Sequence, residues 1–132
     1  MKKIVSIIFV SVLFFTGTSA YAVETREDIL EDAVIDLLQP QLNEVIKDHY
    51  GTTYNISTFC EKVNDIKKLR HPGSRLFEAK LEFATFTGAH NIKDIFTVTL
   101  KKDWEDRIWM VKEYRVHKLK PNDHYDCRVS RK

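Results

Sequence analysis

The hydrophobic period of the chain changes at Gly51, and this change constrains the fold more than any other feature of the sequence. Before Gly51, apolar residues recur every three or four positions over residues 25–50, which is the spacing of one face of an α-helix. After Gly51, apolar and polar residues alternate in short runs, as they do in half-buried β-strands. A chain with this order of elements is expected to fold as an α+β domain.

Residues 25–50 are predicted to form a helix with its own N-terminal cap. Thr25 is the candidate cap, and Asp28 stands three positions later, where a capping box places its acidic partner. Pro40 interrupts the pattern, because proline lacks an N–H and crowds the preceding turn. The apolar stripe nevertheless keeps its phase across Pro40. We therefore expect one kinked helix, or two short helices packed on the same side, ended by Gly51.

Four strands are predicted after Gly51, at residues 54–69, 77–85, 96–100 and 107–117, with residues 88–94 joining the second to the third. The apolar side of such strands must be buried, and the N-terminal helix is the cover that the sequence offers. We expect a kinked helix on one face of a four-stranded antiparallel sheet, with a cystatin-like or nuclear-transport-factor-like shape. In the first strand, one face is expected to hold Tyr54, Ile56, Thr58 and Cys60. In the fourth strand, one face is expected to hold Ile108, Met110, Tyr114 and Val116, and the other Trp109 and Val111.

The first 22 residues have the order of a secretory signal peptide. Two lysines precede an apolar run at residues 4–15, and Ala20-Tyr21-Ala22 is a signal-peptidase pattern that predicts cleavage between Ala22 and Val23. The apolar run is too short for a membrane anchor, because its 12 residues rise only about 18 Å as a helix against a hydrocarbon core of ~30 Å. We expect residues 23–132 to form a single soluble domain outside the cytoplasm.

Charge is unevenly distributed along this domain. Removal of the leader leaves 19 basic and 19 acidic residues, but residues 24–48 carry eight acids and two bases, whereas residues 101–132 carry ten bases and six acids. Such segregation marks a binding surface or simply the solvated faces. The basic tail at residues 118–132 is a candidate contact for an anionic wall polymer or a membrane surface. No nucleic-acid partner is expected, because only Tyr125 offers an aromatic stacking platform there.

Cys60 and Cys127 are the two cysteines of the chain, and an exported protein leaves the reducing compartment. A disulfide between them would close a loop of 67 residues, for which the chain-entropy model gives at most about 4 kcal/mol. The alternative is a buried free thiol at Cys60 and an exposed one at Cys127.

No residue is predicted to be catalytic, and no cofactor is expected. The sequence contains no nucleophile elbow, no phosphate-binding glycine loop and no zinc-protease motif. His117, His124 and Cys127 have a suggestive spacing, but three residues in an irregular segment do not make a tetrahedral metal site. The inward strand positions are almost wholly apolar, and they are Phe77, Ala79, Leu81, Phe83, Phe96, Val98 and Leu100.

A second apolar set is expected on the face of the sheet opposite the helix. It consists of Phe86, Ile95, Trp109 and Val111. Left exposed, this patch would be an interface with a protein partner or a second copy of the chain. The alternatives are that residues 118–132 fold back across it, or that the register slips at a bulge.

Two short segments, LLQPQLNEVIKDHYG and FTGAHN, carry a family resemblance. The chain resembles the small exported proteins grouped as domain of unknown function 3888, which are found mainly in spore-forming Gram-positive bacteria. The matching residues are Leu37, Leu38, Pro40, Tyr50, Gly51, Gly88 and His90, although residues 91–94 lack the prolines typical of the family. The resemblance implies a signal peptide and a short α+β domain, and it implies no activity.

The Gly88-to-Asn91 segment of this motif is expected to be a loop. Gly88 frees the backbone for a turn, and Asn91 tolerates left-handed geometry. No nucleophile or carboxylate stands at a spacing that would make it a partner of His90, so His90 is expected to be a structural or surface residue. The expected function is therefore a non-catalytic binding protein at the cell envelope. The alternative is a small hydrolase-like or isomerase-like cavity enzyme, which a buried polar cluster opening into a pocket would favour.

Overall fold

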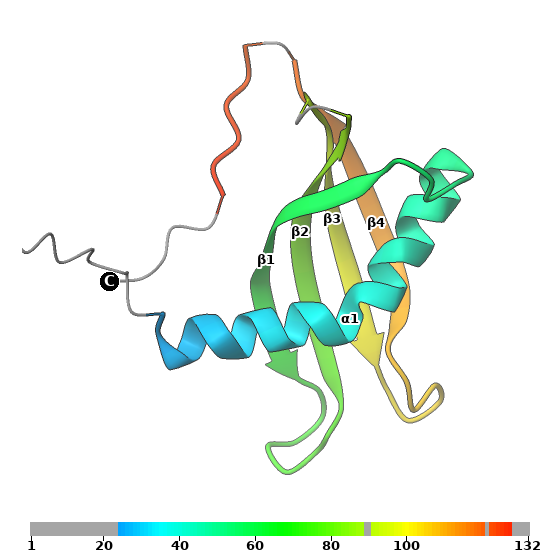
Figure 1. The fold of residues 1–132 in the computed structure, drawn as a ribbon. Helices are drawn as coiled ribbons and strands as arrows, with labels where there is room; N and C mark the ends of the chain where they lie inside the picture. The colour runs from blue at the N-terminus through cyan, green and yellow to red at the C-terminus, as the bar shows by residue number, and fades with distance from the viewer. Residues whose placement is uncertain (1–23, 89–90, 121, 128–132) are drawn as a thin grey trace, which may run out of the picture.

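The computed structural model describes residues 24–88, 91–120 and 122–127. One helix, α1 (Arg26–Tyr50), packs on an open sheet in the order β1-β2-β3-β4 with antiparallel neighbours (Figure 1). The strands are β1 (Ser57–Lys68), β2 (Phe77–Thr87), β3 (Asn91–Lys102) and β4 (Met110–Lys118). The predicted α+β arrangement is confirmed, and the cystatin-like or nuclear-transport-factor-like shape stays a prediction. The expected leader and its cleavage site at Ala22 and Val23 lie outside the described residues.

α1 begins and ends as its sequence predicts. The Thr25 hydroxyl accepts the Asp28 N–H at 3.2 Å, and the Asp28 carboxylate accepts the Thr25 N–H at 3.1 Å. At the other end, Gly51 adopts a left-handed φ of 75° and donates its N–H to the Lys47 carbonyl at 2.8 Å. The helix continues through Pro40 and bends as it crosses the sheet (Figure 1). It is therefore a single kinked helix.

The core lies between α1 and the central strands β2 and β3. Leu38 and Leu42 of α1 are fully buried, and the rings of Phe83 and Phe96 stack beneath the helix with centroids 5.0 Å apart. Phe77, which is also predicted to face inward, is only half-buried and lies outside this cluster. The other six inward positions predicted for these two strands are buried in it. They are Ala79, Leu81, Phe83, Phe96, Val98 and Leu100.

The prediction for the two faces of β4 is wrong for Trp109, Met110 and Val111, whereas Tyr114 and Val116 pack against the core as expected. Leu100 pairs with Val111 whereas Val98 pairs with Tyr114, because β4 carries an extra residue at an irregularity. A bulge of this kind reverses the facing of every later residue relative to strict alternation. As a result, Val111 and Trp109 pack against the core on the helix-covered face, and Met110 is exposed.

The first strand also departs from strict alternation. It begins at Ser57, and Tyr54 lies in an exposed turn before it. A register shift between Phe59 and Lys62 marks a bulge in which Cys60 takes a left-handed φ of 56°. The alternation predicts that Cys60 and Thr58 share one face of the strand. The bulge breaks this pattern and changes the direction of the Cys60 side chain.

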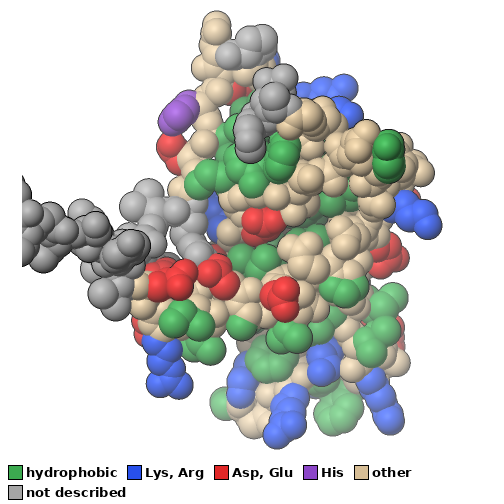
Figure 2. All heavy atoms as spheres, viewed as in Figure 1, with side chains coloured by type: hydrophobic (Ala, Val, Ile, Leu, Met, Phe, Trp, Pro, Cys, Tyr) green, Lys and Arg blue, Asp and Glu red, His purple; other side chains and the backbone are tan. Residues whose placement is uncertain are grey.

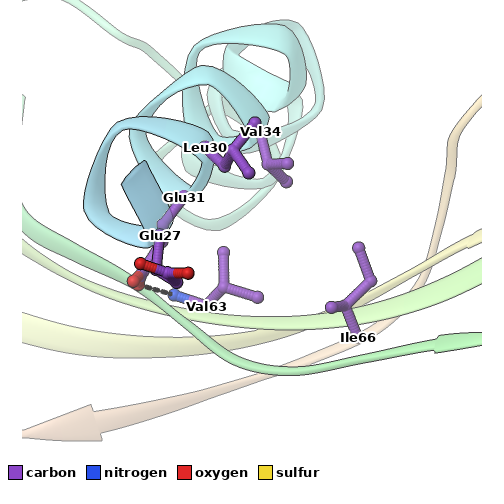
Figure 3. A pocket seen from close by; sticks show the side chains of 6 residues that line it. All are labelled: Glu27, Leu30, Glu31, Val34, Val63 and Ile66. Carbon is purple, nitrogen blue, oxygen red and sulfur yellow. Dashed lines mark hydrogen bonds between the residues drawn. The ribbon is translucent and has the colours of Figure 1, made fainter. Parts of the chain in front are cut away.

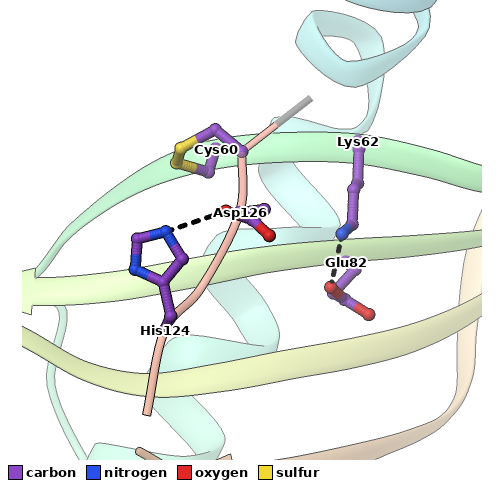
Figure 4. Close-up of a disulfide and its surroundings, with 6 residues drawn as sticks. Cys60, Lys62, Glu82, His124 and Asp126 are labelled. Carbon is purple, nitrogen blue, oxygen red and sulfur yellow. Dashed lines mark ion pairs between the residues drawn. A yellow bond between two sulfur atoms is a disulfide. The ribbon is translucent and has the colours of Figure 1, made fainter. Parts of the chain in front are cut away.

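Part of the face of the sheet opposite α1 lies against the end of the chain. Cys127 is joined to Cys60 by a disulfide, with Cα atoms 4.8 Å apart (Figure 4). Tyr125 lies half-buried, and the Lys62 ammonium is 5.1 Å from its ring centroid. We call residues 119–127, in their described part, the C-terminal strap. Its disulfide holds it to the edge strand β1.

Candidate functional site

An apolar groove runs beneath α1 along the edge of the sheet. Because α1 crosses the sheet obliquely, its first half stands over β1 and leaves a space of about 280 Å³ between them (Figure 3). The lining side chains are Glu27, Leu30, Glu31, Val34, Val63 and Ile66. The Glu31 carboxylate accepts the Val63 N–H at 2.7 Å, so the helix and the edge strand are held together at the start of this space.

A second space of about 270 Å³ continues the first. It is lined by Val34, Leu37, Leu38, Ile66, Phe77 and Trp109. Val34 and Ile66 line both spaces, which therefore form one continuous depression that we call the under-helix groove. The Phe77 and Trp109 rings stack at its far end, with centroids 6.1 Å apart and planes 22° apart. These rigid rings make a preformed apolar wall.

Several apolar groups of the groove remain in contact with solvent. Leu37 is 73% exposed and Ile66 is 48% exposed, although each contributes a side chain to the groove wall. An open, apolar depression with few polar groups is the usual form of a small-molecule or peptide site. The arrangement is suited to burying an apolar part of a ligand.

Opposite charges lie at the two ends of the groove. Glu27 and Glu31 of α1 line the first end. At the other end, the Lys68 ammonium lies 6.0 Å from the centroid of the Phe77 ring and donates to the Pro72 carbonyl at 2.6 Å. Figure 2 shows red carboxylates along the helix and blue basic side chains gathered at the bottom of the view. The groove therefore has a polarity that would orient a charged amphiphile.

A buried polar cluster joins the end of α1 to the sheet, and the sequence patterns do not predict it. The Tyr50 hydroxyl donates to the Asp94 carboxylate and lies 2.9 Å from the Thr85 hydroxyl, which in turn donates to the Asp94 carbonyl at 3.3 Å. Asp94 is only 2% exposed, and Thr85 is fully buried. The apolar alternation of the strands predicts an interior without titratable groups. The structure differs, because the interior contains Asp94 and the hydroxyl of Tyr50. Tyr50 and Asp94 are 44 positions apart in the sequence, so no local pattern indicates that they are in contact.

The surroundings of Tyr50 perturb its ionisation. Burial, reinforced by the hydrogen bond to Asp94, raises the pKa of Tyr50 to about 12. The Lys93 ammonium lies 4.2 Å from the centroid of the Tyr50 ring. A phenol held neutral against a carboxylate that solvent barely reaches fastens the helix end to β2 and β3. It does not offer a substrate an accessible acid or base.

The C-terminal strap packs polar groups against the sheet (Figure 4). Lys62 and Glu82 form an ion pair of 2.8 Å beneath Tyr125. Burial raises the pKa of the Tyr125 hydroxyl, and the neighbouring Glu82 carboxylate raises it further. His124 pairs with Asp126 at 3.0 Å, while the sulfur of Cys127 is bonded to Cys60. The described residues contain no group of three or more His, Cys, Asp or Glu side chains that could hold a metal ion.

The residues predicted to form an apolar surface do not meet in one place. Ile95 and Phe86 lie on the face away from α1, where Ile95 is 7% exposed and Phe86 packs edge-on to Phe59 with centroids 5.3 Å apart. Ile95 also lines a space between the sheet, which contributes Glu82, Thr97 and His117, and the strap. Trp109 belongs instead to the under-helix groove, and Val111 packs against the core. Both alternatives to an exposed patch therefore apply: the strap lies beside Ile95, and the irregularity in β4 moves Val111 to the other face of the sheet.

The family-motif loop is described only at its edges. Gly88 directly follows β2 and has a left-handed φ of 66°. Because β3 begins at Asn91, the connection is shorter than the predicted residues 88–94. His90 lies outside the described residues, and its expected role stays a prediction.

The groove has a weak signal in the sequence. The apolar stripe of α1 includes Leu30 and Leu37, which are seven positions apart and lie on the same side of the helix. Neither is buried in the core. In β1, the alternation loosens from Val63 to Ile66. Together these features indicate apolar side chains without a cover, but only the oblique crossing of α1 places them opposite one another.

Within the described residues, no helix is both long and apolar enough to cross a membrane. Among known protein families, a family model described as a protein of unknown function, DUF3888, matches residues 30–118. No curated protein and no solved structure matches the chain. The matched range extends from the first half of α1 to the last residue of β4, and it includes every strand.

Proposed function

The chain belongs to the DUF3888 family, whose function is unknown, and from this premise we propose that it is a secreted, non-catalytic binding protein of the cell envelope. In this proposal the under-helix groove holds the apolar part of the ligand. The observation that carries it is the continuous wall from Leu30 to Trp109, which stays open although the core beside it is filled. Burial of apolar surface is the main driving force available to such a site.

The disulfide supports the extracytoplasmic part of the proposal. Bridges such as that between Cys60 and Cys127 persist in oxidising surroundings and are rare in the cytosol. The leader expected in the first 22 residues agrees with that location. A protein exported in this way meets membrane lipids, wall polymers and other exported proteins, and the groove selects for a partner with an exposed apolar segment.

A second candidate, a small cavity enzyme, rests on the buried Tyr50, Thr85 and Asp94 cluster. General acid–base chemistry requires a titratable group within reach of the substrate. The Asp94 carboxylate is 2% exposed and already accepts from Tyr50. The cluster is therefore better explained as a joint between helix and sheet, and the binding function is preferred.

Binding of the dye anilinonaphthalene sulfonate to the folded, oxidised domain tests the proposal, because its fluorescence rises in an apolar site. We expect the dye signal to fall strongly in Ile66→Ser, which removes one of the two residues common to both parts of the groove. The matched control is Tyr54→Ser, at a residue that is 79% exposed and outside the groove. Trp109 emission should change on dye binding, since Trp109 lines the site. An unchanged signal in Ile66→Ser would rule out the groove as the site.

A further inference from the structure

Two loops meet at one end of the sheet and are tied to each other. The loop of residues 69–76 joins β1 to β2, and the loop of residues 103–109 joins β3 to β4 (Figure 1). Arg70 and Asp103 connect them with an ion pair of 3.2 Å. Asp103 also pairs with Lys101 at 3.0 Å. These contacts make one surface of the two loops, which we call the loop end.

The loop end exposes large apolar side chains at its tip. Trp104 is 60% exposed and Ile108 is 62% exposed, and neither lines the under-helix groove. The backbone N–H of Trp104 donates to the Asp103 carboxylate at 2.8 Å. This hydrogen bond fixes the backbone at the residue that carries the indole. Large apolar side chains that a structured loop exposes to solvent often mark an interaction surface.

The same end is rich in basic side chains. Residues 67–76 carry four basic residues and no acidic one, and residues 101–112 carry four basic and three acidic residues. Arg75 and Arg107 are exposed and form no ion pair within the described part of the chain. Figure 2 shows Lys and Arg side chains around hydrophobic ones at the bottom of the view, where the two loops lie in Figure 1. The cations are therefore free to meet an anionic partner.

We propose that the loop end docks on an anionic membrane surface, with Trp104 and Ile108 entering the headgroup region and Arg75 and Arg107 contacting lipid phosphates. Tryptophan favours the membrane interface, because its ring is apolar and its N–H is polar. Basic residues near an anionic leaflet each strengthen binding roughly fivefold. A soluble polyanion would satisfy the arginines, but it has no apolar phase for Trp104. The combination therefore favours a lipid surface.

The charge of the rest of the molecule would orient this contact. The first half of α1 carries most of the acids of residues 24–48, and an anionic surface repels them. The loop end would face the membrane while the acidic helix faces away. This docking goes beyond the binding function of the groove and uses different residues, so that either can fail without the other.

Co-sedimentation of the oxidised domain of residues 23–132 with vesicles tests the docking surface. We expect binding at low salt to vesicles that mix phosphatidylglycerol with phosphatidylcholine, and much weaker binding to phosphatidylcholine alone. The double variant Arg75→Ala/Arg107→Ala should bind roughly 25-fold more weakly. The matched control is Lys118→Ala/Lys120→Ala, which removes two exposed basic residues from the other end of β4 and the strap. This control should bind as the unaltered domain does.

A second measurement does not depend on the charge variants. In the Trp109→Phe background, Trp104 is the remaining indole of the chain, and brominated lipids in the vesicles should quench its fluorescence. Absence of quenching, or a loss of binding in the Lys118 and Lys120 control equal to that in the arginine variant, would overturn the proposal. So would equal binding to soluble polyglycerol phosphate without any dependence on Trp104, which would assign the surface to a wall polymer. Dye binding to the groove in the arginine and lysine variants, in which Trp109 is kept, reports separately on the proposed function.

Discussion

Tyr50, the last residue of α1, donates its hydroxyl hydrogen to the buried carboxylate of Asp94 on β3. The contact joins the end of the helix to the strand that follows the Gly88 turn. The motif residues Tyr50 and Gly51 therefore have a structural reason: one makes the joint, and the other ends the helix.

Removing the Tyr50 hydroxyl should destabilise the domain without changing its fold. Tyr50→Phe leaves the carboxylate of Asp94 buried without this donor, and an unsatisfied buried group of this kind costs about 1–3 kcal/mol. Urea unfolding should show a lower midpoint and an unchanged slope. The control Tyr54→Phe, at an exposed residue, should leave the midpoint in place. Equal midpoints for the two variants would show that the joint contributes nothing.

Tyr50 should also ionise late in an alkaline titration. Its folded pKa is raised to about 12 from the ordinary 10.0, so the folded state holds the proton more tightly than the unfolded state does. The stabilisation is complete below pH 10 and is lost as the pH rises from 10 towards 12. Phenolate absorbance of the folded domain, compared with that of Tyr50→Phe, isolates this step. A difference spectrum that titrates near pH 10 would contradict the burial of the phenol.

At acid pH, Asp103 is the group with the clearest expected behaviour. Hydrogen bonds from Lys101, from the Trp104 N–H and from Arg70 lower its pKa to about 2 from 3.8. A depressed folded pKa means that the contribution of Asp103 is present above about pH 4 and is lost as the pH falls towards 2. Carboxyl chemical shifts measured by NMR should place this midpoint. Arg70→Ala should raise it, and a midpoint that does not move would show that the two loops are not coupled through this pair.

The disulfide should account for a large part of the stability of the domain. Replacing both Cys60 and Cys127 with alanine is expected to lower the free energy of unfolding by about 2–4 kcal/mol, because the unfolded chain regains the entropy of an open loop. Denaturant unfolding measures the loss. Reductant should destabilise the unaltered domain and leave the double variant unaffected. A response of the double variant to reductant would mean that the effect does not come from this bridge.

Two adjacent leucines of α1 both line the groove but differ in burial. Leu37 is 73% exposed and Leu38 is fully buried. Leu38→Ala should therefore cost about 2–5 kcal/mol of folding free energy, whereas Leu37→Ala should change it by less than about 0.5 kcal/mol. Thermal unfolding of the two variants makes the comparison at nearly the same helix position. Similar losses in both would show that the groove wall is part of the packed interior.

Local chemistry accounts for most of what was predicted correctly. The capping box of Thr25 and Asp28, the stop at Gly51 and the alternation of β2 act over a few residues, so their signals are visible in the sequence. The alternation was misleading in β1 and β4. Bulges at Cys60 and near Val111 insert single residues, and one inserted residue exchanges the two faces of a strand.

The candidate sites were less predictable than the fold. The exposed Leu37 and Ile66 belong to patterns that normally indicate a core, and only the oblique path of α1 leaves them uncovered on either side of a groove. The pairing of Tyr50 with Asp94, and of Arg70 with Asp103, joins residues far apart in the chain. No periodicity records such a contact.

By itself, the amino-acid sequence determined the class of fold: a capped helix, then strands whose alternation demands a cover. These features depend on backbone geometry and on the local spacing of apolar groups, which neighbouring residues specify together. Tertiary structure alone decided which apolar side chains are buried, where the strap lies and which charges meet at the loop end. Those outcomes depend on the angle at which α1 crosses the sheet and on single-residue irregularities in the strand pairing, among them those at Cys60 and near Val111. Such differences are invisible to local patterns, because they change the partners of a residue without changing its neighbours.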